Sequence, residues 1–413
     1  MKKIISILFL VFLIVLFFLL LYKKNNNEVL SVDKFEDINM LSMMLETEVE
    51  SGKYKETTRS SRPSDGYKFN AELSKCENGS SLSWDNNKKS VVMNSNVSDK
   101  CYIYFDMARF DEVCDDKLLA CHIAKKYTKT QGENNIYYHD KNLENGANDN
   151  SYRYAGSSES TNNFVCFGYE TEDGSCPTDN LYRIIGVFDK QVKLIKSSDI
   201  TKNDLGSLGD FVSYNTGHGG TYKGDTPSSS WYNWNKNNIN EWKDSLLNTE
   251  NLNNYYLNKL GKWGELISVT SWIVGGNTRE KLEQSSMDIV YKNEILSPLN
   301  NTRYQAKIGL LYLSDYGYAA LPRYWSYVGN KNNDSLHDYS ESINDNWLYL
   351  GEGNWFITRC LDDNNFAFVM YYTGAFGVGA LLDLNVVRPS FYLNSHVTYV
   401  AGNGTKNSPF IIK

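Results

Sequence analysis

Residues 181–197, "LYRIIGVFDKQVKLIKS", contain two runs that are rich in β-branched and aromatic residues and are separated by a turn signal. Such runs favour strands, because branched and aromatic side chains pack well on a pleated sheet. A third run of the same kind, "FVCFGY", lies shortly before them. Together the three runs predict a meander of adjacent antiparallel strands, early in a domain that we place at residues 150–413.

A helical region follows the meander in "INEWKDSLLNTENLNNYYLNKLGKW". Ile239, Trp242 and Leu246 form one apolar stripe at helical spacing, and a second stripe begins at Leu252. The two apolar stripes are separated by polar residues 248–249, which predicts two helices with a boundary there. Strands and helices in one domain indicate an α+β fold.

The second half of this domain returns to strand patterns. "AKIGLLYLSDYGYAAL" predicts a strand and then a short helix that Ser314 or Asp315 caps. "NWLYL", "NWFITRC", "FAFVMYYTG" and "VVRPSFYL" predict further strands, and "PFIIK" predicts a last short one. Pro389 has no N–H for a ladder, so its segment should lie at a sheet edge or a strand start.

Cys360, in "NWFITRC", lies beside an arginine that would activate the thiol if the two side chains touched. Successive side chains of a strand point to opposite faces. Phe356, Thr358 and Cys360 then share one face, and Arg359 points away from the thiol. We therefore expect Cys360 to be a packed, unreactive core residue.

The N-terminus predicts a membrane anchor. Residues 4–22 carry one strongly polar side chain, Ser6, and are long enough to cross the hydrocarbon layer as a helix. The apolar run ends directly at lysines, without the small residues of a cleavage site. We expect a single-pass anchor at residues 1–24, with the bulk of the chain outside the cell membrane.

Three segments are predicted between the anchor and the final domain. Residues 25–65 should form an amphipathic stalk helix, on "DINMLSMMLETEVE", followed by a linker. Residues 66–107 should form a small β module, from runs such as "SLSW", "SVVM" and "CYIYF". Residues 108–149 should form a helical connector.

The chain has seven cysteines, six of them before residue 180. Their spacing does not resemble paired CxxC zinc ligands, and an extracellular location permits disulfides. We expect Cys76 to bond Cys101 across the β module, and Cys166 to bond Cys176 around a short loop. Cys114 and Cys121 would lie about 10 Å apart on a continuous helix, so they either pair across a broken helix or stay free.

Composition excludes one class of partner. The formal net charge is −7, and aromatic residues make up 14% of the chain. A nucleic-acid-binding protein needs a basic face, which this sequence does not indicate.

The order of several segments carries a resemblance over most of residues 150–413. "NSYRYAG", "LYRIIGVF", "LNNYYLNKL", "KIGLLYLSDYGYA", "NWFIT" and "VVRPSFYL" resemble the DUF6273-like domain of membrane-anchored bacterial surface proteins. That domain is similar to the C-type-lectin-like fold of formylglycine-generating enzymes. The resemblance therefore implies a C-type-lectin-like fold for the final domain.

The match is uneven within that resemblance. Phe356, Ile357 and Thr358 depart from the family pattern, which leaves no inherited ligand-contacting arginine in that strand. The match is better at residues 387–389, where we expect Arg388 to be structural.

Two classes of function follow. The first is a non-catalytic surface protein that binds a carbohydrate or a protein. Its candidate contact residues are Trp325, Trp347 and Trp355, because flat rings stack on the apolar face of a sugar, although large rings are more often core residues. Asp362 and Asp363, in "CLDDNNF", are candidate ligand-binding residues and the first to test for calcium; otherwise we expect no cofactor. Such aspartates also commonly populate turns.

The second class is an extracytoplasmic enzyme related to formylglycine-generating enzymes, or a structural envelope protein. A copper-thiolate oxidase needs two neighbouring soft ligands, and Cys360 alone does not supply them. His218 lies in a glycine-rich stretch, "NTGHGGTYKG", without a recognisable catalytic motif. We therefore predict no catalytic residues.

The anchor gives a direct prediction. Because residues 1–22 contain no cleavage site, the mature protein should retain them and fractionate with membranes. Peptide mapping of the mature N-terminus checks this expectation. A first peptide that begins after Lys24 would contradict it.

Overall fold

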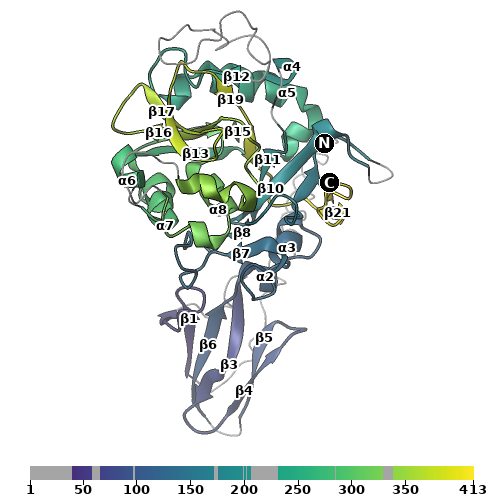
Figure 1. The fold of residues 1–413 in the computed structure, drawn as a ribbon. Coiled ribbons are helices and arrows are strands. Elements are labelled where there is room, and N and C mark those ends of the chain that lie inside the picture. Colours follow the sequence, from purple (N-terminus) through teal and green to yellow (C-terminus); the bar gives the residue numbers. More distant parts are fainter. Residues whose placement is uncertain are drawn as a thin grey trace, which may run out of the picture. The chain divides into compact units, whose positions relative to one another are not determined.

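The computed structural model describes residues 40–57, 66–95, 98–171, 175–198, 200, 202–205, 231–283, 285–328 and 338–413. The chain divides into two compact units, and the boundary lies between Arg109 and Phe110. Figure 1 colours the smaller unit purple to blue and the larger one blue to yellow. The predicted anchor and His218 lie outside the described residues. Within the described ranges, every helix is too short or too polar to cross a lipid bilayer.

The smaller unit is built from strands. Its described strands are β1 (Met40–Glu46), β2 (Tyr54–Thr57), β3 (Tyr67–Cys76), β4 (Ser81–Asp85), β5 (Ser90–Asn94) and β6 (Lys100–Met107). They form a sheet in the order β2-β1-β6-β3 and a β4-β5 hairpin. The alternating runs predicted β4, β5 and β6, whereas β2 lies in the segment that we predicted as a linker. Phe69, Trp84 and Phe105 pack against one another between the sheet and the hairpin.

The predicted stalk helix is wrong. Its core, Met40–Glu46, is strand β1, which pairs in parallel with β6 and antiparallel with β2. The apolar spacing of this segment suits a helix, but two neighbouring strands satisfy its backbone groups instead. Pairing with distant strands overrides a short local periodicity.

The larger unit contains an antiparallel sheet and a second sheet that mixes parallel and antiparallel pairs. The first has the order β15-β20-β11-β10-β8-β7, with β9 paired to β10. Its strands are β7 (Ile136–Tyr138), β8 (Tyr152–Tyr154), β9 (Phe164–Cys166), β10 (Leu181–Phe188), β11 (Gln191–Lys196), β15 (Ile308–Gly309) and β20 (Ser390–Tyr392). The predicted meander is confirmed, because β9, β10 and β11 pair antiparallel in sequence order.

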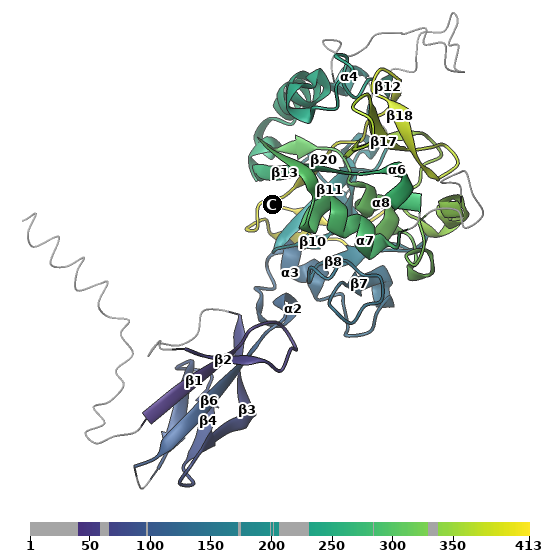
Figure 2. The ribbon, with the colours of Figure 1, turned by 90° about the vertical axis from the view of Figure 1, so that its left-hand side faces the viewer.

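Strands β10 and β11 are buried along almost their whole length. Burial on both faces fits the largely apolar sequence of β10, whereas β11 also carries Lys193 and Lys196 into the buried region. Gly186 is required in β10, since a Cβ there would lie 2.3 Å from the carbonyl oxygen of Tyr152 on β8. β20, yellow in Figure 2, comes from the far end of the chain and lies between β11 and β15.

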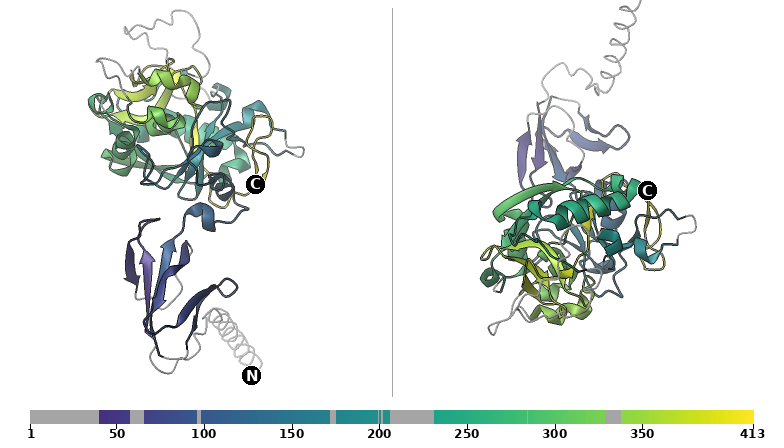
Figure 3. Two further views of the ribbon diagram at one scale, coloured as in Figure 1. Left: turned by 60° about the horizontal axis from the view of Figure 1, so that its bottom comes forward. Right: turned by 90° about the horizontal axis from the view of Figure 1, so that it is seen from above.

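The second sheet has the order β12-β19-β16-β13-β14, extended by β17 and β18. Its strands are β12 (Trp231–Tyr232), β13 (Thr270–Asn277), β14 (Leu299–Ala306), β16 (Asn354–Cys360), β17 (Phe366–Met370), β18 (Phe376–Ala380) and β19 (Asn385–Val386). A last hairpin, β21 (Tyr399–Ala401) and β22 (Ile411–Ile412), lies beside the C-terminus (Figures 1 and 3).

Short helices cover these sheets. The α-helices are α2 (Phe110–Val113), α3 (Leu119–Ala124), α4 (Lys202–Leu205), α5 (Leu257–Lys259), α6 (Arg279–Glu283), α7 (Met287–Tyr291) and α8 (Leu313–Ala319). The 3₁₀ segments are η1 (Glu133–Asn135), η2 (Thr178–Asn180), η3 (Trp242–Asp244), η5 (Gly261–Leu266), η7 (Pro322–Tyr324) and η8 (Asp338–Asp345). Two π-helical segments, η4 (Leu247–Tyr256) and η6 (Lys292–Leu296), continue into α5 and from α7. Helices α6, α7 and α8 lie together in Figures 1 and 2.

Some local predictions fail at their boundaries. The helix interruption lies at Ser245, which has extended backbone, so the predicted break at residues 248–249 is wrong. "NWLYL", residues 346–350, forms turns instead of a strand. Pro389 directly precedes β20, which confirms the predicted strand start.

We predicted a separate connector at residues 108–149, and all of it from Phe110 onward belongs to the larger unit. Leu119, Ile136 and Tyr138 are buried in its core. The predicted connector therefore contributes apolar side chains to the core of the larger unit.

All three expected or open cysteine pairs are bonded: Cys76 to Cys101, Cys166 to Cys176 and Cys114 to Cys121. The first two confirm the predictions. The third resolves the open alternative, because α2 ends before Cys114 and α3 begins at Leu119. The Cα atoms of Cys114 and Cys121 are thereby 5.6 Å apart, well short of the helical separation.

The third bridge gives a prediction. Replacing both Cys114 and Cys121 by serine should lower the free energy of unfolding by about 2 kcal/mol, because a short loop is released in the unfolded chain. Denaturant unfolding measures the change, and peptide mapping without reduction should find the linked pair in the parent protein. An unchanged unfolding midpoint would contradict a stabilising role for this bridge.

Candidate functional site

The three candidate tryptophans are core residues. Trp325, Trp347 and Trp355 are at most 1% exposed. Each indole N–H donates to a backbone carbonyl at 2.8–2.9 Å, on Ala320, Tyr154 and Tyr232 respectively. Rings held in this way offer no face to a sugar at the surface. This corrects their assignment as candidate contact residues.

The two candidate aspartates bond to neighbouring backbone. Asp362 accepts from the N–H of Arg279 at the start of α6, and Asp363 accepts from the N–H of Asn365 at 2.9 Å. These are the ordinary roles of aspartate at helix starts and in turns. Among the described residues, the group of three potential metal ligands is Cys76, Asp99 and Cys101, and both sulfurs there belong to a disulfide.

Cys360 is buried at 1% exposure, as the strand pattern predicted. Its thiol donates to the Asp362 carboxylate at 2.9 Å. Burial, and then the neighbouring Asp362 carboxylate, raise the pKa of the thiol to about 11. The neighbouring Arg359 guanidinium lies 3.5 Å from Glu241. The thiol is therefore protonated at neutral pH and is a poor nucleophile.

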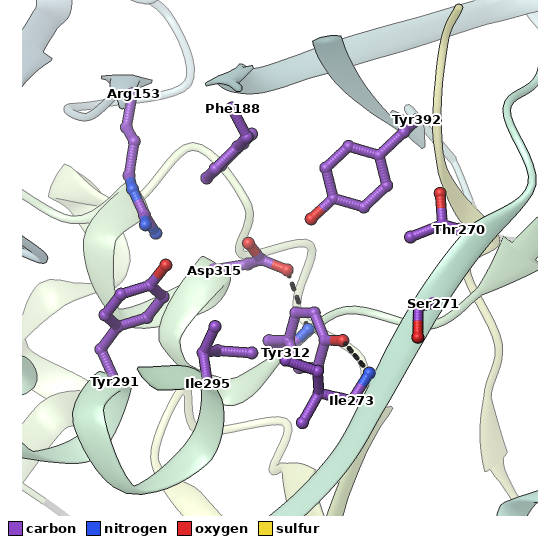
Figure 4. Close-up of a pocket in the computed structure, with 10 residues that line it drawn as sticks. All are labelled: Arg153, Phe188, Thr270, Ser271, Ile273, Tyr291, Ile295, Tyr312, Asp315 and Tyr392. Carbon is purple, nitrogen blue, oxygen red and sulfur yellow. Dashed lines mark hydrogen bonds between the residues drawn. The ribbon is translucent and has the colours of Figure 1, made fainter. Parts of the chain in front are cut away.

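A pocket of about 110 Å³ lies within the larger unit (Figure 4). Its walls combine four aromatic rings with two charged side chains: Phe188, Tyr291, Tyr312, Tyr392, Arg153 and Asp315. They come from β8, β10, β20, the α7–η6 helix and the start of α8, and β13 completes the wall. The volume suits a group of a few heavy atoms.

Helix α8 places Asp315 in the pocket wall. Asp315 is the third residue of the helix, and its Oδ2 accepts from the N–H of Tyr312 at 2.8 Å. This capping bond confirms the predicted role of Asp315 at the helix start. Glu294 of η6 accepts from the N–H groups of Leu313 and Ser314, both at 3.0 Å. The first turn of α8 is thus fixed from two sides.

Two buried ion pairs lie beside the pocket. Lys193 Nζ of β11 donates to Asp315 Oδ2 at 2.6 Å, and the side chains are 0% and 3% exposed. Arg153 Nη2 donates to Asp149 Oδ2 at 2.6 Å, with exposures of 2% and 13%. The Tyr291 hydroxyl also donates to Asp149. Each cation therefore has its own carboxylate, as burial of charge requires.

Aromatic rings surround both cations. The Arg153 guanidinium lies 4.7–4.8 Å from the ring centres of Phe188, Tyr291 and Tyr318. Lys193 Nζ lies 4.4 Å from the ring centre of Tyr312. These contacts stabilise buried cations through the ring quadrupole.

The environment shifts the pKa of each group in a definite direction. Burial acts to raise the pKa of Asp149, but Arg153, His139 and two hydroxyl groups outweigh it and lower the pKa to about 2. Burial lowers the pKa of Lys193 against the opposing effect of Asp315. Burial raises the pKa of Tyr392, and the Asp315 carboxylate adds to this effect. The pocket tyrosines therefore stay neutral at physiological pH.

Several polar atoms of the pocket have no hydrogen-bond partner in the described part of the chain, and one of them is the buried Thr270 Oγ1 of β13. Three more are Arg153 Nη1, Asp315 Oδ1 and the Tyr392 hydroxyl, since the hydrogen bonds of the Arg153 and Asp315 side chains use their other atoms. Figure 4 shows the Tyr392 hydroxyl and one oxygen of Asp315 turned toward the space between them, with the guanidinium on the far side. This arrangement presents donors and an acceptor to a bound group.

Sequence reasoning missed this pocket. Arg153, Asp315 and Tyr392 occur in segments that were quoted for fold resemblance or capping, and they are far apart in the chain. A lysine in a buried strand, at Lys193, was the available signal of a buried charge that needs a partner.

No protein-family model, curated protein or solved structure matches this chain. The resemblance to DUF6273-like domains and to the C-type-lectin-like fold therefore stays a prediction.

The Asp149 carboxylate gives a pH prediction. Its folded-state pKa of about 2 lies below the ordinary value of 3.8, so its contribution to stability is present above pH 3.8 and is lost as pH falls toward 2. The loss should be about 2 kcal/mol. Denaturant unfolding of the larger unit between pH 5 and pH 2 measures it.

Asp149→Asn is the matched variant. It should lack this pH-dependent contribution, and it should be destabilised at pH 7 by about 3–5 kcal/mol because Arg153 loses its buried partner. Equal pH dependence in the parent and in Asp149→Asn would contradict the assignment.

Proposed function

We propose that this chain is a membrane-anchored, non-catalytic surface protein whose larger unit binds a polar group of a carbohydrate or protein ligand in the pocket beside Arg153. The observation that carries the proposal is a group of unpartnered polar atoms on aromatic walls, among them Arg153 Nη1, Asp315 Oδ1 and the Tyr392 hydroxyl. Polar atoms in a concave, partly buried site cost free energy unless a ligand or water satisfies them. A ligand group that satisfies them therefore gains affinity.

The cysteines support an extracytoplasmic location. Six of the seven form disulfides, which persist in oxidising compartments and are rare in the cytosol. The predicted anchor at residues 1–24 accounts for retention at the membrane, with the bulk of the chain outside.

The chemistry of the pocket favours binding over catalysis. Lys193 and Asp315 bond each other, and the raised pKa values of Tyr312 and Tyr392 keep both hydroxyls neutral. A general base or nucleophile needs a pKa near the working pH or an adjacent activating group. The alternative enzyme, a relative of formylglycine-generating enzymes, needs a pair of thiols, whereas Cys360 is buried and the other cysteines are bonded.

A substitution that fills the pocket tests this function. Ile295 of η6 lines the pocket, and Leu296, the next residue, is 51% exposed and does not. Full-length protein, purified in detergent, should bind members of a glycan, peptidoglycan and surface-protein array. Ile295→Trp should weaken that binding at least about tenfold, because the indole occupies the space of the ligand group.

Leu296→Trp is the matched control and should bind as the parent does. Thermal unfolding of both variants shows whether the fold is kept. Absence of any array ligand for the parent, or equal binding by a folded Ile295→Trp variant, would overturn the proposed function.

A further inference from the structure

The free hydrogen-bonding groups of the pocket are of mixed type. Arg153 Nη1 offers N–H donors, Asp315 Oδ1 offers an acceptor, and the Tyr392 hydroxyl offers both. Arg153 and Asp315 are 2% and 3% exposed, so bulk water gives them little compensation. A ligand that satisfies all three must itself both donate and accept.

The charges of the pocket are balanced before any ligand binds. Arg153 is paired with Asp149, and Lys193 is paired with Asp315. A ligand anion would meet the free oxygen of Asp315, and a ligand cation would meet the guanidinium of Arg153. Each would lose its hydration without gaining an unpaired counter-charge. An uncharged ligand avoids this cost.

The walls add a requirement on shape. Tyr291, Tyr312 and Tyr392 supply ring surface around the polar atoms (Figure 4). Aromatic rings favour a partner with a flat apolar face. The volume of about 110 Å³ accommodates one edge of a larger molecule and excludes the whole of a drug-sized one.

We infer that the pocket recognises the hydroxyl-bearing edge of an uncharged sugar residue, whose neighbouring hydroxyls accept from Arg153 Nη1, donate to Asp315 Oδ1 and bond the Tyr392 hydroxyl. This inference rests on the proposed function and narrows its ligand to one class. Hydroxyl groups both donate and accept, and the C–H face of a pyranose stacks on the tyrosine rings. The pocket therefore distinguishes ligands by their hydroxyl groups and not by a net charge.

The test compares sugars that share a ring and differ in charge. Methyl glucoside, methyl glucuronide and glucosamine form one such set, and galactose and mannose series form two more. Full-length protein in a detergent without a sugar head group is titrated with each, by saturation-transfer NMR or calorimetry. In at least one series the neutral sugar should bind at least about tenfold more tightly than both charged ones.

Salt and point substitutions sharpen the test. Raising NaCl from about 0.05 to about 0.5 M should leave the affinity for the neutral sugar unchanged, because no net charge is recognised. Tyr392→Phe removes one free hydroxyl and should weaken binding by about 5- to 10-fold. Tyr399→Phe, which removes a hydroxyl bonded to the Gly402 carbonyl in the C-terminal hairpin, is the matched control and should bind as the parent does.

Arg153→Lys separates geometry from charge. Lysine keeps the positive charge near Asp149 but cannot place a second nitrogen in the pocket. The variant should lose at least about tenfold in affinity for the neutral sugar, and rescue by a negatively charged sugar is not expected.

The outcomes distinguish the two proposals. Tightest binding of a charged sugar in every series would overturn this inference and leave the binding function standing. The same conclusion would follow if the array identified a ligand that contains no sugar and if Ile295→Trp abolished its binding. Unchanged binding of the neutral sugar in both Tyr392→Phe and Arg153→Lys would also overturn it. No ligand at all would overturn both.

Discussion

The buried ion pair between Lys193 and Asp315 ties the two halves of the larger unit together. Lys193 belongs to β11 in the middle of the first sheet, and Asp315 begins helix α8, which lies more than a hundred residues later. The two side chains are 0% and 3% exposed, so each charge needs the other as its partner. Asp315 also caps its own helix, so the same carboxylate oxygen bonds both the sheet and the start of α8.

Other buried charged side chains around α8 also have hydrogen-bond partners. Arg153 of β8 bonds Asp149, and Glu294 accepts from the first N–H groups of the helix and from the Thr358 hydroxyl of β16. Two further buried arginines, Arg183 and Arg388, donate to backbone carbonyls on Trp347, Lys196 and Leu348. Polar side chains therefore connect layers that apolar packing alone would leave free to slide.

The pocket arises from this network. Bonds within the pairs use one oxygen of Asp315 and one Nη nitrogen of Arg153, and the second atom of each has no hydrogen-bond partner among the described residues. Tyrosine rings that stabilise the cations also form the walls. Stability and recognition thus depend on the same side chains, so variants that keep the pairs intact are the informative ones.

The sequence by itself determined the features whose partners are close in the chain. The β9–β11 meander, the β4–β5 hairpin, the Cys166–Cys176 bridge and the Asp315 cap were all predicted, because turn signals and side-chain spacing act over a few residues. The Cys76–Cys101 bridge was predicted as well, whereas the shorter Cys114–Cys121 loop stayed open because its pairing depends on a break between two helices. The burial of Cys360 was also predicted, although all of β16 is buried, so burial does not distinguish one face of the strand from the other.

Only the tertiary structure decided the rest. Met40–Glu46 has helical spacing but pairs with β6, some 60 residues away, and the three candidate tryptophans look like contact residues until their burial is known. The residues that line the pocket are spread between positions 153 and 392, so no local sequence pattern predicts it. Local patterns report how a segment is built, whereas the partner that buries a face or pairs a charge is selected when distant segments pack together.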